Sequence, residues 1–159
     1  MQYLWINPVS AGMCEEDSLK RFLERHGLTR VECRGDWGRI VRERYEASLR
    51  AGVTLADARC PEAVRLLEEI QKEPENESGI ENLKVAPIEP ILLHCARELS
   101  TRPDLADGEK IITTPCQSLA VLGNSLGLEN TRFIAWNRLA GGEVRVRAIE
   151  DSPIPPGYF

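Results

Sequence analysis

The stretch Ile111-Ile-Thr-Thr-Pro-Cys-Gln-Ser-Leu-Ala-Val-Leu-Gly123 places a cysteine between a strand and a helix. Residues 111–114 are β-branched, which predicts a short buried strand, and Pro115 ends it. Residues 117–126 carry leucines at helical spacing, so Cys116 is expected at the N-terminus of a helix. The unpaired N–H groups and the dipole of a helix N-terminus favour a thiolate. Cys116 is therefore the candidate catalytic residue.

The rest of the chain repeats this strand-then-helix arrangement. Further strands are expected at residues 3–6, 28–33, 53–58, 83–87 and 131–136, and an edge strand at 143–149. Helices with apolar stripes lie between them, the first opening at Met13 and Cys14 after a loop at 7–12. Strands that alternate with helices predict an α/β fold of three layers, αβα. Its sheet would be mostly parallel, with about five to seven strands.

Length and charge narrow the class of protein. The 159 residues fit one domain at 1–151, followed by an extended proline-rich tail at 152–159. The net charge of −5 argues against binding to nucleic acid or to an anionic membrane surface. No signal peptide or membrane span is expected, which predicts a cytoplasmic location. Five cysteines, none in a Cys-x-x-Cys motif, fit a reducing compartment where thiols stay free or bind metal.

Four of the five cysteines follow expected strands. Because ligands bind beyond the carboxyl ends of parallel strands, these four are expected at one edge of the sheet: Cys14, Cys33, Cys60 and Cys116. Soft thiolates select iron–sulfur clusters and other thiophilic metals, so the four are the candidate metal and cofactor ligands. Their spacing matches no zinc-ribbon or ferredoxin pattern, and simple packing of small apolar side chains is the alternative. Cys95 is set apart as a core residue because it shares a helical stripe with Ile91 and Leu99.

Three short segments carry a resemblance to a known family: Leu28-Thr-Arg-Val-Glu-Cys-Arg-Gly-Asp-Trp-Gly38, Ala58-Arg-Cys-Pro-Glu-Ala-Val64 and Lys110-Ile-Ile-Thr-Thr-Pro-Cys116. In this order they resemble segments of the catalytic (H-cluster) domain of iron-only hydrogenases, over residues 28–123. The resemblance implies that Cys60 stands where that family has a cluster ligand, and Cys116 where it has a cysteine near the di-iron site. Arg59 stands in place of the family's proton-transferring cysteine, and Pro87 stands near the next expected ligand. We therefore expect no hydrogen turnover.

These observations leave three classes of function open. The first is a cysteine-based iron–sulfur or metal-binding redox or accessory protein, compatible with a redox protein as partner. The second is a metal-free thiol-dependent redox protein that works through Cys116 or Cys14. The third is an interaction protein that has kept the fold and lost the chemistry. The sequence does not decide whether the chain is an enzyme, and it gives no oligomeric state.

Overall fold

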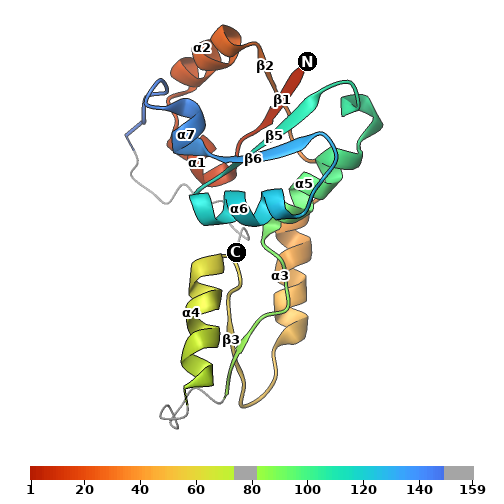
Figure 1. Cartoon of the computed structure of the whole chain (residues 1–159), viewed down its shortest axis with the longest axis vertical. Coiled ribbons are helices and arrows are strands. Elements are labelled where there is room, and N and C mark those ends of the chain that lie inside the picture. The colour runs from red at the N-terminus through yellow and green to blue at the C-terminus, as the bar shows by residue number, and fades with distance from the viewer. Residues whose placement is uncertain (74–81, 149–159) are drawn as a thin grey trace. The chain divides into compact units, whose positions relative to one another are not determined.

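The computed structural model describes residues 1–73 and 82–148 (Figure 1). The described residues fall into two compact units, the first with residues 1–35 and 92–148 and the second with residues 36–73 and 82–91. The second unit is thus an insertion in the sequence of the first. A single domain at 1–151 stays a prediction, and the tail expected at 152–159 lies outside the described residues.

The first unit contains a four-stranded parallel sheet. Its strand order is β2-β1-β5-β6, formed by β1 (Gln2–Trp5), β2 (Leu28–Arg30), β5 (Glu109–Thr114) and β6 (Thr131–Ala135). The central pair is in register with Tyr3 opposite Lys110 and Leu4 opposite Ile111. β1 and β5 read as nearly continuous buried runs, as strands covered on both faces do. The α/β fold with a parallel sheet is confirmed.

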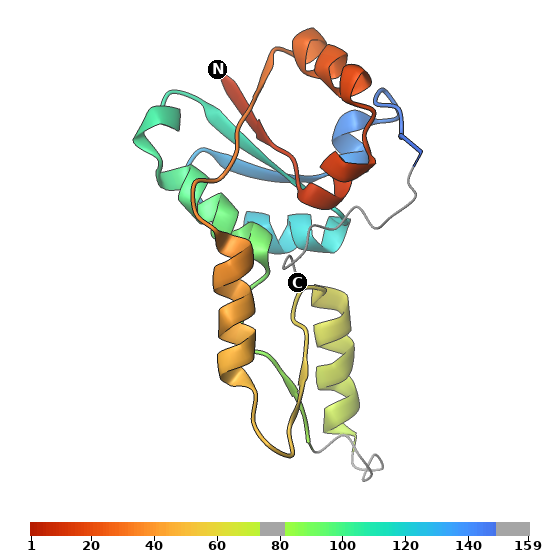
Figure 2. The same ribbon diagram turned by 180° about the vertical axis from the view of Figure 1, so that it is seen from behind.

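Helices cover both faces of this sheet (Figures 1 and 2). One face carries α1 (Pro8–Met13), α2 (Glu16–His26) and α7 (Trp136–Ala140), and the other carries α5 (Ile91–Thr101) and α6 (Gln117–Ser125). A short 3-10 helix, η1 (Pro103–Leu105), follows α5. On the first face, Leu4, Ile6 and Ile111 pack with Leu19 and Phe22 of α2 in one apolar core.

The strand order creates a switch point between β1 and β5. From β1 the chain continues to β2 on one side of the sheet, whereas from β5 it continues to β6 on the other side. In open α/β sheets, ligands bind outside the carboxyl ends of the strands at such a point. The loops after Trp5 and Thr114 therefore border the part of the first unit where a site is expected.

The second unit has its own two-stranded parallel sheet. It consists of β3 (Thr54–Ala56) and β4 (Leu83–Val85) with α3 (Trp37–Ser48) and α4 (Pro61–Lys72). Asp36 caps α3, because its side chain accepts a hydrogen bond from the Arg39 backbone N–H. The six internal strands expected from the sequence are present, but they are divided over two sheets. Within the described residues, no helix is long and apolar enough to cross a membrane.

Three local expectations were wrong. Residues 8–12, expected in a loop, belong to α1, because Asn7 caps this helix and Pro8 fits its first turn. The next helix begins at Glu16 rather than at Met13, since Cys14 forms an isolated antiparallel bridge with Val146. That bridge is the only strand-like pairing in the described part of the expected edge strand, residues 143–148, which crosses the α1–α2 junction instead of joining the sheet.

Candidate functional site

A buried polar network lies at the switch point, centred on Asn7. The Asn7 side-chain oxygen accepts from the Ser10 backbone N–H at 2.9 Å, and its amide nitrogen donates to Ser10 Oγ at 2.9 Å. Thr113 Oγ1 accepts from the Asn7 backbone N–H at 2.9 Å and from its side-chain amide at 3.2 Å. The network ties the loop after β1 to β5, so it fixes the shape of this edge.

Cys116 lies on the other side of the switch point, where the sequence placed it. It is the N-cap residue of α6 and is exposed. Its backbone carbonyl accepts from Thr114 Oγ1 at 2.6 Å, which fixes the turn between β5 and α6. The position at a helix N-terminus is confirmed, whereas a catalytic role for Cys116 stays a prediction.

Cys14 is a core thiol. Its side chain is part of the apolar cluster with Leu4 and Leu19 and is 8% exposed. The Cys14 thiol donates to the Ser10 carbonyl at 3.1 Å. Burial raises the pKa of Cys14, although Arg30 opposes part of this effect. A raised pKa keeps Cys14 protonated at neutral pH, which disfavours its use as a nucleophile.

Cys60 belongs to the second unit, where it is the exposed N-cap residue of α4. The neighbouring Arg59 is held in place by Asp57, whose carboxylate lies 2.7 Å from the Arg59 guanidinium. Asp57 also accepts from the Arg59 backbone N–H at 2.8 Å. Arg59 therefore takes part in a local turn with Asp57.

The metal-ligand prediction is not decided by these positions. Among the described residues, which include all five cysteines, no group of three or more His, Cys, Asp or Glu side chains could hold a metal ion. The expected ligand set of Cys14, Cys33, Cys60 and Cys116 therefore stays a prediction.

Two thiols of the first unit, Cys33 and Cys95, lie close enough to interact. Their interaction raises the pKa of Cys33. Cys33 lies half-buried in the loop after β2, and Cys95 is buried in the first half of α5. The prediction that Cys95 is a core residue is confirmed, because its side chain is buried. Its exclusion from the candidate ligand set stays a prediction. Both cysteines are reduced in the structure.

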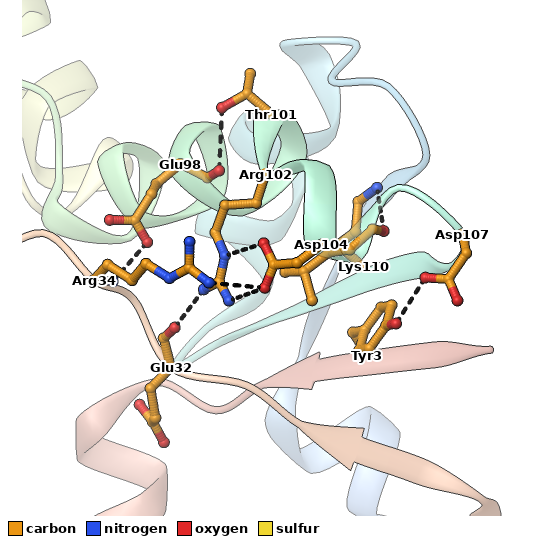
Figure 3. Close-up of polar contacts among 10 residues, drawn as sticks. Tyr3, Glu32, Arg34, Glu98, Thr101, Arg102, Asp104, Asp107 and Lys110 are labelled. Atoms are coloured by element: carbon orange, nitrogen blue, oxygen red, sulfur yellow. Dashed lines mark hydrogen bonds and ion pairs between the residues drawn. The ribbon is translucent and has the colours of Figure 1, made fainter.

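The loop that carries Cys33 is anchored to α5 and to the segment that follows it (Figure 3). The Glu98 carboxylate accepts from the backbone N–H groups of Arg34, at 2.8 Å, and Gly35, at 2.5 Å. Arg102 donates to the Glu32 carbonyl at 2.8 Å. Both residues flanking Cys33 are therefore fixed through their backbones, which limits where the Cys33 thiol can point.

Asp104 links two arginines beside this loop. Arg102 binds its carboxylate through two nitrogens, at 3.1 and 2.7 Å, and Arg34 binds one of the same oxygens at 3.0 Å (Figure 3). The hydrogen bonds from Arg102, more than any other cause, lower the pKa of Asp104 to about 2. The Arg102 side chain is only 14% exposed, so this pair is better shielded from solvent than most surface ion pairs.

The surroundings of Cys33 keep its thiol protonated. The interaction with the Cys95 side chain is the largest cause of a strongly raised Cys33 pKa, followed by burial. The Cys95 and Glu98 side chains add electrostatic effects of the same sign, because a second negative charge is unfavourable there. The Arg102 guanidinium interacts electrostatically with Cys33. Cys33 therefore reacts as a thiolate only after it loses a firmly held proton.

The sequence contains a signal for the Cys33–Cys95 pair. The strand-end rule, by which ligands are expected beyond the carboxyl ends of parallel strands, missed this signal. Cys95 and Glu98 are three residues apart on α5, so their side chains lie on one face of the helix, and Arg102 follows the end of the helix directly. An acid on the same helical face as a cysteine indicates a polar contact rather than uniform core packing. Comparison of the chain with family models, curated proteins and solved structures found no match.

Proposed function

We propose that this chain is a metal-free, thiol-dependent redox protein whose working pair is Cys33 and Cys95. The observation that supports this proposal is the interaction between the two side chains, which is the largest cause of the raised Cys33 pKa. Two thiols in contact can form a disulfide without a large movement of the backbone. The other cysteines offer no comparable contact: Cys14 bonds to a carbonyl in the core, and Cys60 and Cys116 are exposed at helix N-termini.

The reaction transfers two electrons. Two protein thiols and one low-molecular-weight disulfide become one protein disulfide and two small thiols, so the protein is oxidised and the small disulfide is reduced. The Cys33 thiolate attacks a sulfur of the small disulfide and releases the first small thiolate. The Cys95 sulfur then gives up its proton and attacks Cys33 Sγ, which forms the protein disulfide and releases the second small thiolate. Cys33 takes the first step because it is half-exposed, whereas Cys95 is buried.

The test is to oxidise the full chain with oxidised glutathione and to map its disulfides by mass spectrometry. Trypsin releases Cys33 in peptide 31–34 and Cys95 in peptide 85–97, each with a single cysteine. We expect these two peptides to be linked in the native protein and in the Cys60→Ser/Cys116→Ser variant. Linkage of other cysteines in place of this pair, or no linkage under oxidising conditions that leave the fold intact, would contradict the proposal.

Metal binding, expected from the sequence, is tested with the same protein. Anaerobic purification, reconstitution with iron and sulfide, and analysis of both elements would detect a cluster. A bound cluster that is lost in Cys60→Ser would favour the metal-binding function instead. Assay of the reconstituted protein with a strong reductant is expected to give no hydrogen.

A further inference from the structure

Glu98 holds the two backbone N–H groups that come directly after Cys33. One carboxylate oxygen accepts from Arg34 at 2.8 Å, and the other accepts from Gly35 at 2.5 Å. A carboxylate that receives two backbone donors forms charge-assisted hydrogen bonds, which are stronger than bonds between neutral groups. Glu98 is therefore a main anchor of the loop after β2.

The position of Glu98 on α5 places this anchor beside Cys95. The two residues are three apart in the helix and face the same side. Because Cys33 directly precedes the first anchored amide, the bond to Glu98 fixes Cys33 above the same helical face. The Glu98 carboxylate also interacts with the Cys33 thiol and raises its pKa.

We propose that Glu98 is the positioning residue for oxidation of the Cys33–Cys95 pair: it holds the loop against α5 and sets how readily the pair forms a disulfide. This inference rests on the proposed redox function. Glu98 exchanges no electrons and forms no bond with the oxidant. Instead it brings the two sulfurs together and places a negative charge beside Cys33.

These two effects of Glu98 act in opposite directions. The anchor raises the effective concentration of one thiol at the other, which favours the disulfide once Cys33 has been attacked. The negative charge disfavours the Cys33 thiolate, which slows the attack. Two other groups act on the Cys33 thiol. Cys95, like Glu98, disfavours the Cys33 thiolate, whereas the positive charge of Arg102 favours it. Asp104 neutralises part of the Arg102 charge.

Substitutions at position 98 separate the two effects. Glu98→Gln removes the charge and leaves an amide that cannot accept from both N–H groups, whereas Glu98→Asp keeps the charge but shortens the reach. If loss of the charge lowers the pKa of Cys33 by about one unit, the thiolate is roughly tenfold more abundant but less nucleophilic, so its attack is roughly threefold faster at neutral pH. Glu129→Gln is the matched control, because Glu129 is exposed in the first unit.

The experiment measures two quantities in the full chain with Cys60→Ser/Cys116→Ser as background. The first is the rate of oxidation by oxidised glutathione from pH 6 to 9, and the second is the equilibrium between dithiol and disulfide in glutathione buffers. We expect Glu98→Gln to shift the rate profile to lower pH and Glu98→Asp to leave it in place. Both should reduce the fraction of disulfide at equilibrium severalfold, and Glu129→Gln should change neither quantity.

The outcomes separate this inference from the proposed function. A rate profile of Glu98→Gln that superimposes on that of the background protein would overturn the inference, even if the disulfide equilibrium changes, because a purely structural residue would behave so. An unchanged equilibrium in both variants would overturn it as well. If the Cys33–Cys95 disulfide does not form in the background protein, the proposed function itself fails. Circular dichroism of each variant confirms that the fold is intact.

Discussion

Oxidation of Cys33 and Cys95 should stabilise the protein against global unfolding. The disulfide closes a loop of about 60 residues, and the chain-entropy relation gives about 4 kcal/mol of stabilisation for a loop of this length. Since the two side chains already interact in the reduced protein, we expect closing the bond to require little rearrangement of the native state. We therefore expect a gain close to this value.

Urea unfolding of oxidised and reduced protein measures the effect. The Cys60→Ser/Cys116→Ser variant removes the two exposed thiols, so that mixed disulfides do not complicate the comparison. Free energies of unfolding should be compared rather than midpoints, because a cross-link also changes the surface that unfolding exposes. Cys33→Ser in this background cannot form the bond and should give the same stability under both conditions.

Chain connectivity adds a sharper expectation. Residues 36–91, the second unit, lie entirely within the loop that the disulfide closes. While the first unit is folded, it already holds the two ends of this loop, so the disulfide removes little further entropy from local unfolding of the second unit. Hydrogen exchange in α3 and α4 should therefore be unchanged by oxidation. A disulfide shown by mass spectrometry that leaves the global free energy of unfolding unchanged or lower would refute this reasoning.

Three further predictions concern other parts of the structure. Gly123→Ala should destabilise the protein by about 2 kcal/mol in thermal or urea unfolding, because the added Cβ would lie 2.2 Å from the Phe133 ring; a stabilised variant would contradict the packing of α6. In the reduced protein, Cys116 should react with iodoacetamide faster than Cys14, since Cys14 is buried and its pKa is raised; mass-spectrometric mapping that finds equal rates would argue against this. Asp104, whose pKa is lowered to about 2, should support stability fully above its unfolded pKa near 4 and lose this effect as the pH falls through 2. An NMR titration that finds the Asp104 carboxyl protonating near pH 4 would contradict this assignment.

The spacing of apolar residues and the positions of turn residues in the sequence predicted the strands and most of the helices. Asp36 and Gly27 illustrate why: each acts locally, the first by capping α3 and the second by ending α2 in a left-handed conformation. The pairing of strands was less accessible, because β3 and β4 look like members of a common sheet until their partners are known. The Cys14–Val146 bridge was missed for the same reason, since alternation predicts an extended chain but not its neighbour.

The candidate site illustrates the limit of the strand-end rule. The local sequence alone placed Cys116 correctly at the N-terminus of α6. The rule grouped cysteines by the edge of a sheet, however, and gave no weight to a helix that packs beside the loop after β2. The contact of Cys33 with Cys95 joins residues about 60 positions apart, so it depends on how that loop crosses α5. The only sequence signal for this contact was that Cys95 and Glu98 lie on one face of α5.

The cysteines that are oxidised fastest in this protein should differ from those that are oxidised at equilibrium. Cys60 and Cys116 are exposed, so an oxidant in solution reaches them first. Cys33 is half-buried and its pKa is raised, so its attack on an oxidant is slow at neutral pH. At equilibrium the order reverses, because Cys33 and Cys95 are already in contact, and closing their disulfide releases a small thiol without bringing in a second protein molecule. Mixed disulfides on the exposed cysteines can be reversed by exchange with small thiols, whereas the internal disulfide accumulates. A brief pulse of oxidant would thus leave the internal pair reduced, and sustained oxidation would close it, which is the behaviour of a slow redox switch rather than of a fast thiol catalyst.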